Sequence, residues 1–223
     1  MVFARGGVNR LLALALNSVA NFHRPGPSHG SGRSGAILQP PGTYTVTLSA
    51  GGEKQSQPLV ILKDPSSGGS EETIAAQLAV ERALARDLNE VVEQVNALEV
   101  VRGQIVALRE LAGSKGIAAE LKGPVDSIEA SLLAVEGKLF QMTTTGRGQD
   151  FNRRPVRLAE QINYLADVTG LTDFAPTQSQ RDVQHILHEQ WLRIRPQVQA
   201  FLDRELPAFN ERLRASGVRT VVP

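Results

Sequence analysis

LARDLNEVVEQVNALEVVRGQIVAL, the stretch from residue 84 to residue 108, decides the fold of this chain. Its large aliphatic side chains recur mostly at alternating intervals of four and three residues, which places them along one side of an α-helix. They are Leu84, Leu88, Val91, Val95, Leu98, Ile105 and Leu108. Arg102 interrupts the row, and Val101 and Ile105 lie close enough along the chain to cover the interruption. The pattern predicts a long amphipathic helix from about Glu71 to Leu111.

This helix has a start signal and a stop signal. Ser70 precedes Glu71 and Glu72, an order typical of an N-cap followed by acids placed favourably against the helix dipole. The glycine-containing segment Ala112–Gly116 ends the helix. Residues 66–70, Ser-Ser-Gly-Gly-Ser, predict a flexible joint in front of it.

A second helix is expected from about Ile117 to Met142, bent or restarted at Gly123-Pro124 because proline removes a backbone donor. Its apolar stripe has intervals of three, four, three, four and three residues: Val125, Ile128, Leu132, Val135, Leu139 and Met142. A polar, glycine-containing loop from Thr143 to Asn152 follows.

Two further helical stretches are expected. Pro155 should open a short third helix that ends near Val168 and carries Leu158, Ile162 and Leu165. After a break at Gly170–Gln178, the last stretch covers about Ser179 to Ala215, with kinks or restarts expected at its two prolines, Pro196 and Pro207. Its apolar members are Val183, Leu187, Ile194, Val198, Phe201, Leu202, Phe209 and Leu213.

The period changes upstream of the helices. Residues 43–48, Thr-Tyr-Thr-Val-Thr-Leu, alternate strictly, as in a half-buried β-strand. The face without threonine carries Tyr44, Val46 and Leu48. Residues 50–53, Ala-Gly-Gly-Glu, suit a tight turn, because glycine adopts positive φ angles readily, and Pro58–Leu62 is the return strand. An isolated hairpin is marginal in water, so we expect it to complete a larger sheet or to pack on the helices.

These patterns predict a mainly α protein, an antiparallel bundle of three to four long helices preceded by a small β-hairpin. A family resemblance described below implies that the hairpin is a partial Ig-like β segment. Residues 37–65 are expected to form the hairpin, which the resemblance assigns to an incomplete Ig-like domain, and residues 70–216 are expected to form the helical bundle. Residues 1–36 are a poorly ordered or partial β segment and linker, since residues 23–42 contain four prolines among several glycines and serines.

Composition narrows the function classes. The 223 residues carry a net charge of +1, so bulk electrostatics give no reason to expect nucleic acid or anionic lipid as a partner. The lack of cysteine excludes disulfides, thiolate metal sites and cysteine nucleophiles. No run approaches the roughly 20 apolar residues of a membrane span. Leu11–Leu16, after Arg5 and Arg10, is an apolar run of six, shorter than the ~7–15 of an export signal.

The stretch HILHE, from His185 to Glu189, comes nearest to a metal site. Its histidines can share a helix face, and its glutamate can act as a base. The order His-x-x-His-Glu matches neither known zinc-hydrolase pattern, and the remaining histidines, His23 and His29, lie in the linker. A polar helix face is therefore the preferred interpretation, and no metal ligand, cofactor site or catalytic residue is predicted.

Other polar groupings have equally simple interpretations. Carboxylate pairs can hydrolyse glycosides, but here they alternate with arginines in ordinary surface spacing. The glycine pairs are too short for phosphate loops, and few aromatic residues are present to stack nucleic acid bases. The groupings are Glu90 with Glu93, Asp203 with Glu205, Gly6 with Gly7, Gly146 with Gly148, Arg153 and Arg154 with Arg157, and Arg193 with Arg195. Trp191 is expected to anchor the core.

Several segments resemble one protein family. Residues 41–48, PGTYTVTL, then Gly51-Gly52, Gln57-Pro58-Leu59 and Asp64-Pro65, resemble the closing hairpin of an Ig-like β-domain and the start of a helical tail. Residues 205–210, ELPAFN, with Leu213 and Gly217-Val218, resemble the last helix of that tail. Both belong to the C-terminal region of large bacterial β-propeller proteins with sortilin-like or BNR (Asp-box) repeats, often labelled glycosyl hydrolases.

The resemblance covers roughly residues 40–223 and, more weakly, residues 6–30, where Gly7–Arg10 and Pro25–Pro27 are similar to a strand and loop of the family. The chain departs from the family at Leu11–Leu16, where an aromatic Trp-Asp-type strand is usual. Catalysis in the family would belong to the propeller, and no Asp-box of the form Ser-x-Asp-x-Gly-x-Thr-Trp occurs here, so no catalytic residue is carried over.

The leading hypothesis is a non-catalytic accessory or interaction module whose partner is a protein, either a propeller domain or another copy. The first alternative is a self-associating helical scaffold, motivated by Arg102 in the apolar row and by the exposed linker. The second is part of a glycoside hydrolase whose active site lies in a missing propeller. The resemblance implies an exported or periplasmic protein, whereas Leu11–Leu16 predicts no export signal.

Overall fold

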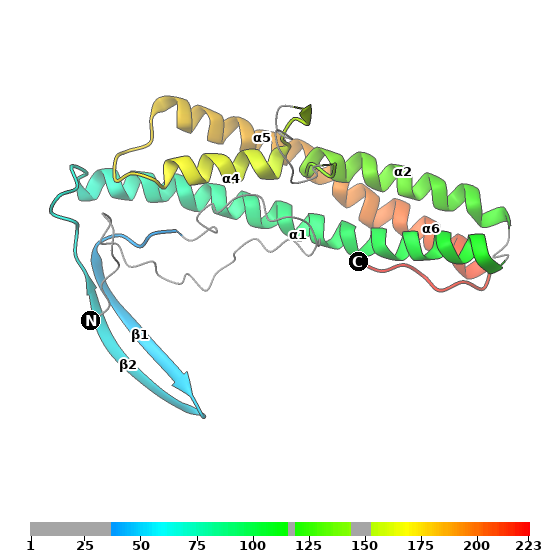
Figure 1. Cartoon of the computed structure of the whole chain (residues 1–223), viewed down its shortest axis with the longest axis horizontal. Coiled ribbons are helices and arrows are strands. Elements are labelled where there is room, and N and C mark those ends of the chain that lie inside the picture. Colours follow the sequence, from blue (N-terminus) through cyan, green and yellow to red (C-terminus); the bar gives the residue numbers. More distant parts are fainter. Residues whose placement is uncertain (1–36, 116–118, 144–152) are drawn as a thin grey trace.

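The structure, a computed structural model, describes residues 37–115, 119–143 and 153–223. This part of the chain is mainly helical, with a two-stranded antiparallel hairpin on the N-terminal side of a helix bundle (Figure 1). The predicted fold class is therefore confirmed. The predicted N-terminal segment, residues 1–36, lies outside the described residues.

The longest element is α1, Glu71–Lys115, which extends along the whole length of the bundle (Figure 1). Its start follows the prediction: the Thr73 backbone N–H donates to the Ser70 hydroxyl at 3.1 Å, and Glu71 and Glu72 occupy the first turn. A capped and correctly charged first turn stabilises the end of the helix from which the hairpin leaves.

Two shorter helices run antiparallel to α1, each along one half of it. After a 3-10 turn, η1 (Ala119–Leu121), α2 spans Lys122–Leu139 and packs on the C-terminal half of α1. Helix α4 spans Leu158–Thr169 and packs on the N-terminal half (Figure 1). The two therefore follow one another in the same direction, instead of forming a pair of antiparallel neighbours.

The last helical stretch runs back parallel to α1. It consists of α5, Gln178–Ala200, a π-helical segment η2, Phe201–Glu205, and α6, Leu206–Ala215, which continue one another (Figure 1). Side-chain contacts between α1 and α5 join residues that are 101 to 105 positions apart, with both numbers increasing together. The bundle is thus up, down and up, with the middle layer divided into α2 and α4.

The core consists mainly of the predicted apolar rows. Leu84, Val91, Leu98 and Ile105 of α1 are buried, and so are all but the last member of the α2 stripe, Val125, Ile128, Leu132, Val135 and Leu139. Val101 occupies the row where Arg102 interrupts the pattern. One prediction is wrong: Val183 is exposed, because the buried stripe of α5 begins only at Leu187.

The prolines divide into those that begin helices and those that do not. Pro124 lies in the first turn of α2, where a missing N–H removes no hydrogen bond. Pro207 lies in the first turn of α6, directly after the π-helical segment that α6 continues. Helix α5 includes Pro196. The prediction that Pro155 opens a helix is wrong, since α4 begins three residues later at Leu158 and the Pro155 carbonyl accepts a hydrogen bond from Gln141 Nε2 at 2.8 Å.

The hairpin consists of β1, Gly42–Ala50, and β2, Glu53–Ile61. Gly51 and Gly52 have φ angles of 59° and 88°, as the predicted tight turn requires. The prediction of a half-buried strand is wrong, because no described element covers the outer half of the hairpin, which leads away from the bundle (Figure 1).

Candidate interaction site

Within residues 37–115, 119–143 and 153–223, no third strand pairs with the hairpin, so both of its backbone edges are open, and the groups on each edge follow from the register. Ala50 and Glu53 flank a two-residue turn and form the first hydrogen-bonded pair, and such pairs alternate along an antiparallel ladder. Every second residue of each strand therefore directs its N–H and C=O away from the other strand. On β1 these residues are Thr43, Thr45, Thr47 and Ser49.

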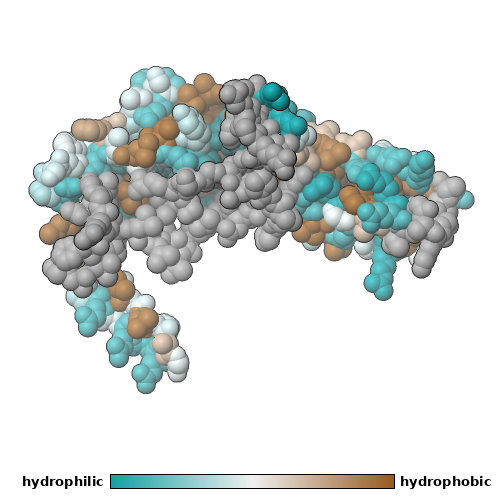
Figure 2. Space-filling model, in the orientation of Figure 1, coloured by the Kyte–Doolittle hydropathy of each residue, from teal (hydrophilic) through white to brown (hydrophobic). Residues whose placement is uncertain are grey.

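The two faces of the hairpin differ in polarity. One face carries Tyr44 opposite Leu59, followed outward by Val46 and Leu48, whose exposed fractions are 52% and 67%. The other carries the threonines of β1, with the Thr47 and Ser56 hydroxyls 2.8 Å apart across the strands. Figure 2 shows the projecting tip as a mixture of apolar and polar patches.

The two edges differ in charge and in donors. Strand β1 contains no charged residue, whereas β2 begins with Glu53 and Lys54. Pro58 lies opposite Thr45, at a position whose N–H would face outward, so the outer edge of β2 lacks one donor. The outer edge of β1 has no such interruption, and native proteins rarely leave an uncharged edge of this kind without a partner.

The base of the hairpin is held in place. The Tyr44 hydroxyl donates to the Pro40 carbonyl at 2.7 Å, and Lys63 Nζ donates to the Ser67 carbonyl at 2.7 Å. A Cβ on Gly69 would lie 2.2 Å from the Asp173 carbonyl oxygen. The segment expected to be a flexible joint is therefore a turn packed against the loop between α4 and α5.

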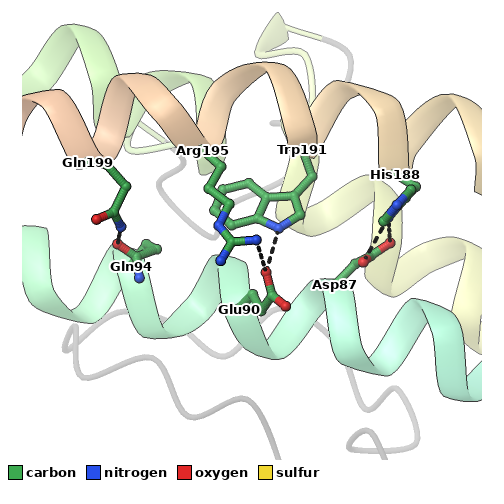
Figure 3. Close-up of polar contacts among 7 residues, drawn as sticks. All are labelled: Asp87, Glu90, Gln94, His188, Trp191, Arg195 and Gln199. Atoms are coloured by element: carbon green, nitrogen blue, oxygen red, sulfur yellow. Dashed lines mark hydrogen bonds and ion pairs between the residues drawn. The ribbon is translucent and has the colours of Figure 1, made fainter.

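The bundle contains a polar row where α1 and α5 meet (Figure 3). His188 Nδ1 lies 3.0 Å from each Asp87 carboxylate oxygen. Trp191 Nε1 donates to Glu90 Oε2 at 3.0 Å, and Arg195 pairs with the same oxygen at 3.5 Å. Gln199 donates to Gln94 farther along. Each contact joins the two helices, so the row fixes their register.

Most of the residues considered for metal binding and acid catalysis are exposed or are engaged by a neighbouring helix. His185 is exposed, and the described residues include no group of three or more His, Asp or Glu side chains that could hold a metal ion. Glu90 is engaged by Trp191, whereas Glu93 is exposed. Asp203 and Glu205 are also exposed, on the π-helical segment.

Arg102 has its partners inside the chain. Its guanidinium pairs with Glu99 on the same helix and lies 3.9 Å from Glu136 Oε2 of α2. The Glu136 side chain has no solvent exposure, and that of Arg102 has 25%. The residue that seemed to interrupt the apolar row thus supplies a positive charge beside a buried carboxylate.

The arginine cluster lines an open depression of about 370 Å³. Arg153, Arg154 and Arg157 border it together with Phe140 and Gln141 of the preceding segment. The two glycine pairs, Gly6 with Gly7 and Gly146 with Gly148, and the run Leu11–Leu16 lie outside the described residues.

Sequence reasoning missed the partners of the polar row. His188 was noticed beside His185, and Trp191 was expected in the core, where it is 1% exposed. No sequence signal pairs either residue with Asp87 or Glu90, because the offset of 101 residues depends on the parallel register of α1 and α5.

No described helix is both long and apolar enough to span a membrane. Comparison of the chain with protein-family models, curated proteins and solved structures finds no match. The arguments for function therefore rest on the chain itself. The most distinctive feature of its described part is the uncharged edge of β1, which no other described strand covers.

Proposed function

We propose that this chain is a non-catalytic interaction module, in which the helical bundle is a rigid support and the β1–β2 hairpin docks onto a protein partner by strand pairing. The observation that carries the proposal is the outer edge of β1, which is free of charge and of proline and borders an exposed apolar face. Strand addition uses backbone hydrogen bonds for affinity and alternate side chains for specificity.

The contacts within the bundle fit its proposed role as a rigid support. Its apolar rows face one another, and its polar row is occupied by contacts between α1 and α5. The hairpin exposes Val46, Leu48 and Val60, and the bundle also exposes apolar side chains such as Tyr164 and Ile186. The unpaired backbone edge of β1, and not apolar exposure alone, therefore distinguishes the hairpin. A two-stranded sheet is marginal alone and gains stability when further strands join it.

The resemblance to tails of sortilin-like or BNR β-propeller proteins suggests one class of partner, a propeller or Ig-like β-domain, and with it an exported location. The same resemblance keeps a glycoside hydrolase with a separate propeller as the second candidate. The helical scaffold stays an alternative, with less support from Arg102, because this residue pairs with Glu99 and lies close to Glu136 within the chain.

A photo-crosslinking amino acid at Leu48, in the full chain in the producing cell, tests the proposal. Leu48 lies near the hairpin tip, and Leu133 of α2, 40% exposed, is the matched control on the bundle. Light should produce a discrete protein adduct from position 48 and none from position 133. The absence of any adduct from position 48, or equal adducts from both, contradicts docking through the hairpin.

The purified chain should also hydrolyse no member of a panel of aryl glycosides. Turnover that disappears on replacement of one acid, for example Glu93→Gln or Asp203→Asn, would contradict the non-catalytic assignment and favour the hydrolase.

A further inference from the structure

We infer that the partner of the hairpin is a second copy of this chain, joined to the first through antiparallel pairing of the two β1 strands. This inference rests on the proposed function and adds to it the identity of the partner and the register of the contact. It makes a four-stranded sheet in the order β2, β1, β1, β2, related by a two-fold axis.

The chemical pattern of β1 is symmetric about its middle residue, Val46. Moving outward in both directions, hydroxyl residues Thr45 and Thr47 come first, then apolar Tyr44 and Leu48. Next come hydroxyl residues again, Thr43 and Ser49, and small residues at both ends, Gly42 and Ala50. A strand with this symmetry presents matching side chains to an antiparallel copy of itself.

The hydrogen-bonding pattern and full overlap of the two strands together leave one register. The outward-facing N–H and C=O groups of β1 belong to its odd-numbered residues. The two-fold axis must therefore place odd residues of one copy opposite odd residues of the other, as hydrogen-bonded pairs. Full overlap then places Val46 opposite Val46, Thr45 opposite Thr47, and Thr43 opposite Ser49 of the second copy. Every outward N–H and C=O from Thr43 to Ser49 receives a partner.

The same register joins the apolar faces. Tyr44 of each copy lies opposite Leu48 of the other, with the two Val46 side chains between them on the same face. Aromatic and β-branched cross-strand pairs of this kind stabilise sheets. The exposed row Val46–Leu48 thereby becomes the centre of a larger apolar face.

Charge and overall shape permit this arrangement. Because β1 carries no charged residue, self-pairing brings no like charges together. Antiparallel pairing sets the base of one hairpin beside the tip of the other, so the two bundles lie at opposite ends of the sheet. The outer edge of β2 is the poorer choice, because it has Pro58 in place of a donor and the charges of Glu53 and Lys54 near its tip.

Cysteine cross-linking tests the register, and the chain has no cysteine of its own. Two residues that face each other at a non-hydrogen-bonded position have Cα atoms about 4.5 Å apart, within the range that a disulfide spans. Val46→Cys should therefore form a covalent dimer under mild oxidation. Leu48→Cys, although more exposed, should not, because its counterpart lies four residues farther along the paired strand.

Equal cross-linking of both variants, or none from Val46→Cys, would overturn the register.

A second pair of variants tests which edge of the hairpin makes the contact. Thr47 and Ser56 face each other across the hairpin, and each has an outward N–H. Thr47→Pro should abolish the dimer, whereas Ser56→Pro, with the same change on the other edge, should preserve it.

Sedimentation equilibrium measures the molecular mass of the assembly directly. The full chain should show a mass about twice 24.1 kDa, and Thr47→Pro should halve that mass while the helical circular dichroism and its thermal transition stay unchanged. A full chain that remains monomeric at all concentrations refutes self-pairing. If Leu48 then still forms photo-adducts with another protein in the cell, only this inference fails and the proposed docking function stands.

Discussion

Trp191 Nε1 of α5 donates a hydrogen bond to Glu90 Oε2 of α1 at 3.0 Å, across 101 residues of sequence. The indole ring is 1% exposed, whereas the Glu90 side chain is 47% exposed. The contact thus joins a buried aromatic side chain to a carboxylate at the rim of the bundle. Packing of the indole ring and the hydrogen bond to Glu90 should contribute differently to stability.

Replacing the indole separates packing from hydrogen bonding. Trp191→Ala should lower the free energy of unfolding by about 3–5 kcal/mol, because it leaves a large cavity. Trp191→Phe should cost less, about 1–3 kcal/mol, since one aromatic ring still fills part of the space and Glu90 can return to water. Urea unfolding followed by circular dichroism measures both. The neighbouring Leu192→Ala, at a position 43% exposed, should change stability by about 0.5 kcal/mol or less.

The contact between His188 and Asp87 should be energetically coupled. A double-mutant cycle with His188→Gln and Asp87→Asn is expected to give an interaction energy of about 0.5–1.5 kcal/mol, because the Asp87 side chain is only 10% exposed. The exposed His185 serves as control: a cycle of His185→Gln with Asp87→Asn should give no coupling. Equal coupling for both histidines would mean that the contact is not specific.

In the arginine–glutamate pairs, burial of the carboxylate should affect the free energy of unfolding more than the distance between the charged groups does. Arg109 approaches Glu129 at 2.6 Å but is 52% exposed, and Arg109→Met should cost about 0–1 kcal/mol. Arg102 lies 3.9 Å from the fully buried Glu136, and Arg102→Met should cost about 2–3 kcal/mol, because a buried carboxylate loses a neighbouring cation. Unfolding curves that rank the two variants in the reverse order would contradict this assignment.

Two adjacent glycines should respond differently to alanine. A Cβ on Gly69 would overlap the Asp173 backbone, so Gly69→Ala should cost about 1–3 kcal/mol and speed amide exchange in the turn before α1. A Cβ on Gly68 would lie 3.4 Å from the Phe174 ring, in ordinary contact, so Gly68→Ala should be tolerated. Similar exchange rates in both variants would show that the turn does not depend on this close approach.

Local chemistry predicted much of the fold. The row from Leu84 to Ile105 is buried as its spacing requires, the Ser70 cap forms, and the paired glycines Gly51 and Gly52 adopt positive φ angles. Each of these features depends on residues a few positions apart, so periodicity and backbone preferences were sufficient to find them.

Features that depend on distant segments were not predictable. In the predicted antiparallel bundle each helix reverses the direction of the one before it, yet α2 and α4 run in the same direction along two halves of α1. Val46 and Leu48 alternate with threonines as in a half-buried strand, yet both are exposed. Burial requires a covering layer, and the alternation of residues does not predict whether one is present. The pairing of His188 with Asp87 likewise follows from the helix register alone.

The π-helical segment Phe201–Glu205 marks a place where this molecule contains one residue more than an α-helix would need. The buried positions Leu187, Trp191, Ile194, Val198, Phe201, Leu206, Phe209 and Leu213 are separated by four, three, four, three, five, three and four residues. Deleting one exposed residue, Asp203 or Arg204, would make the alternation perfect. With Pro207→Ala to restore the missing donor, the shortened chain would keep every apolar side chain on its face, whereas a single deletion elsewhere would rotate all that follows by about 100°.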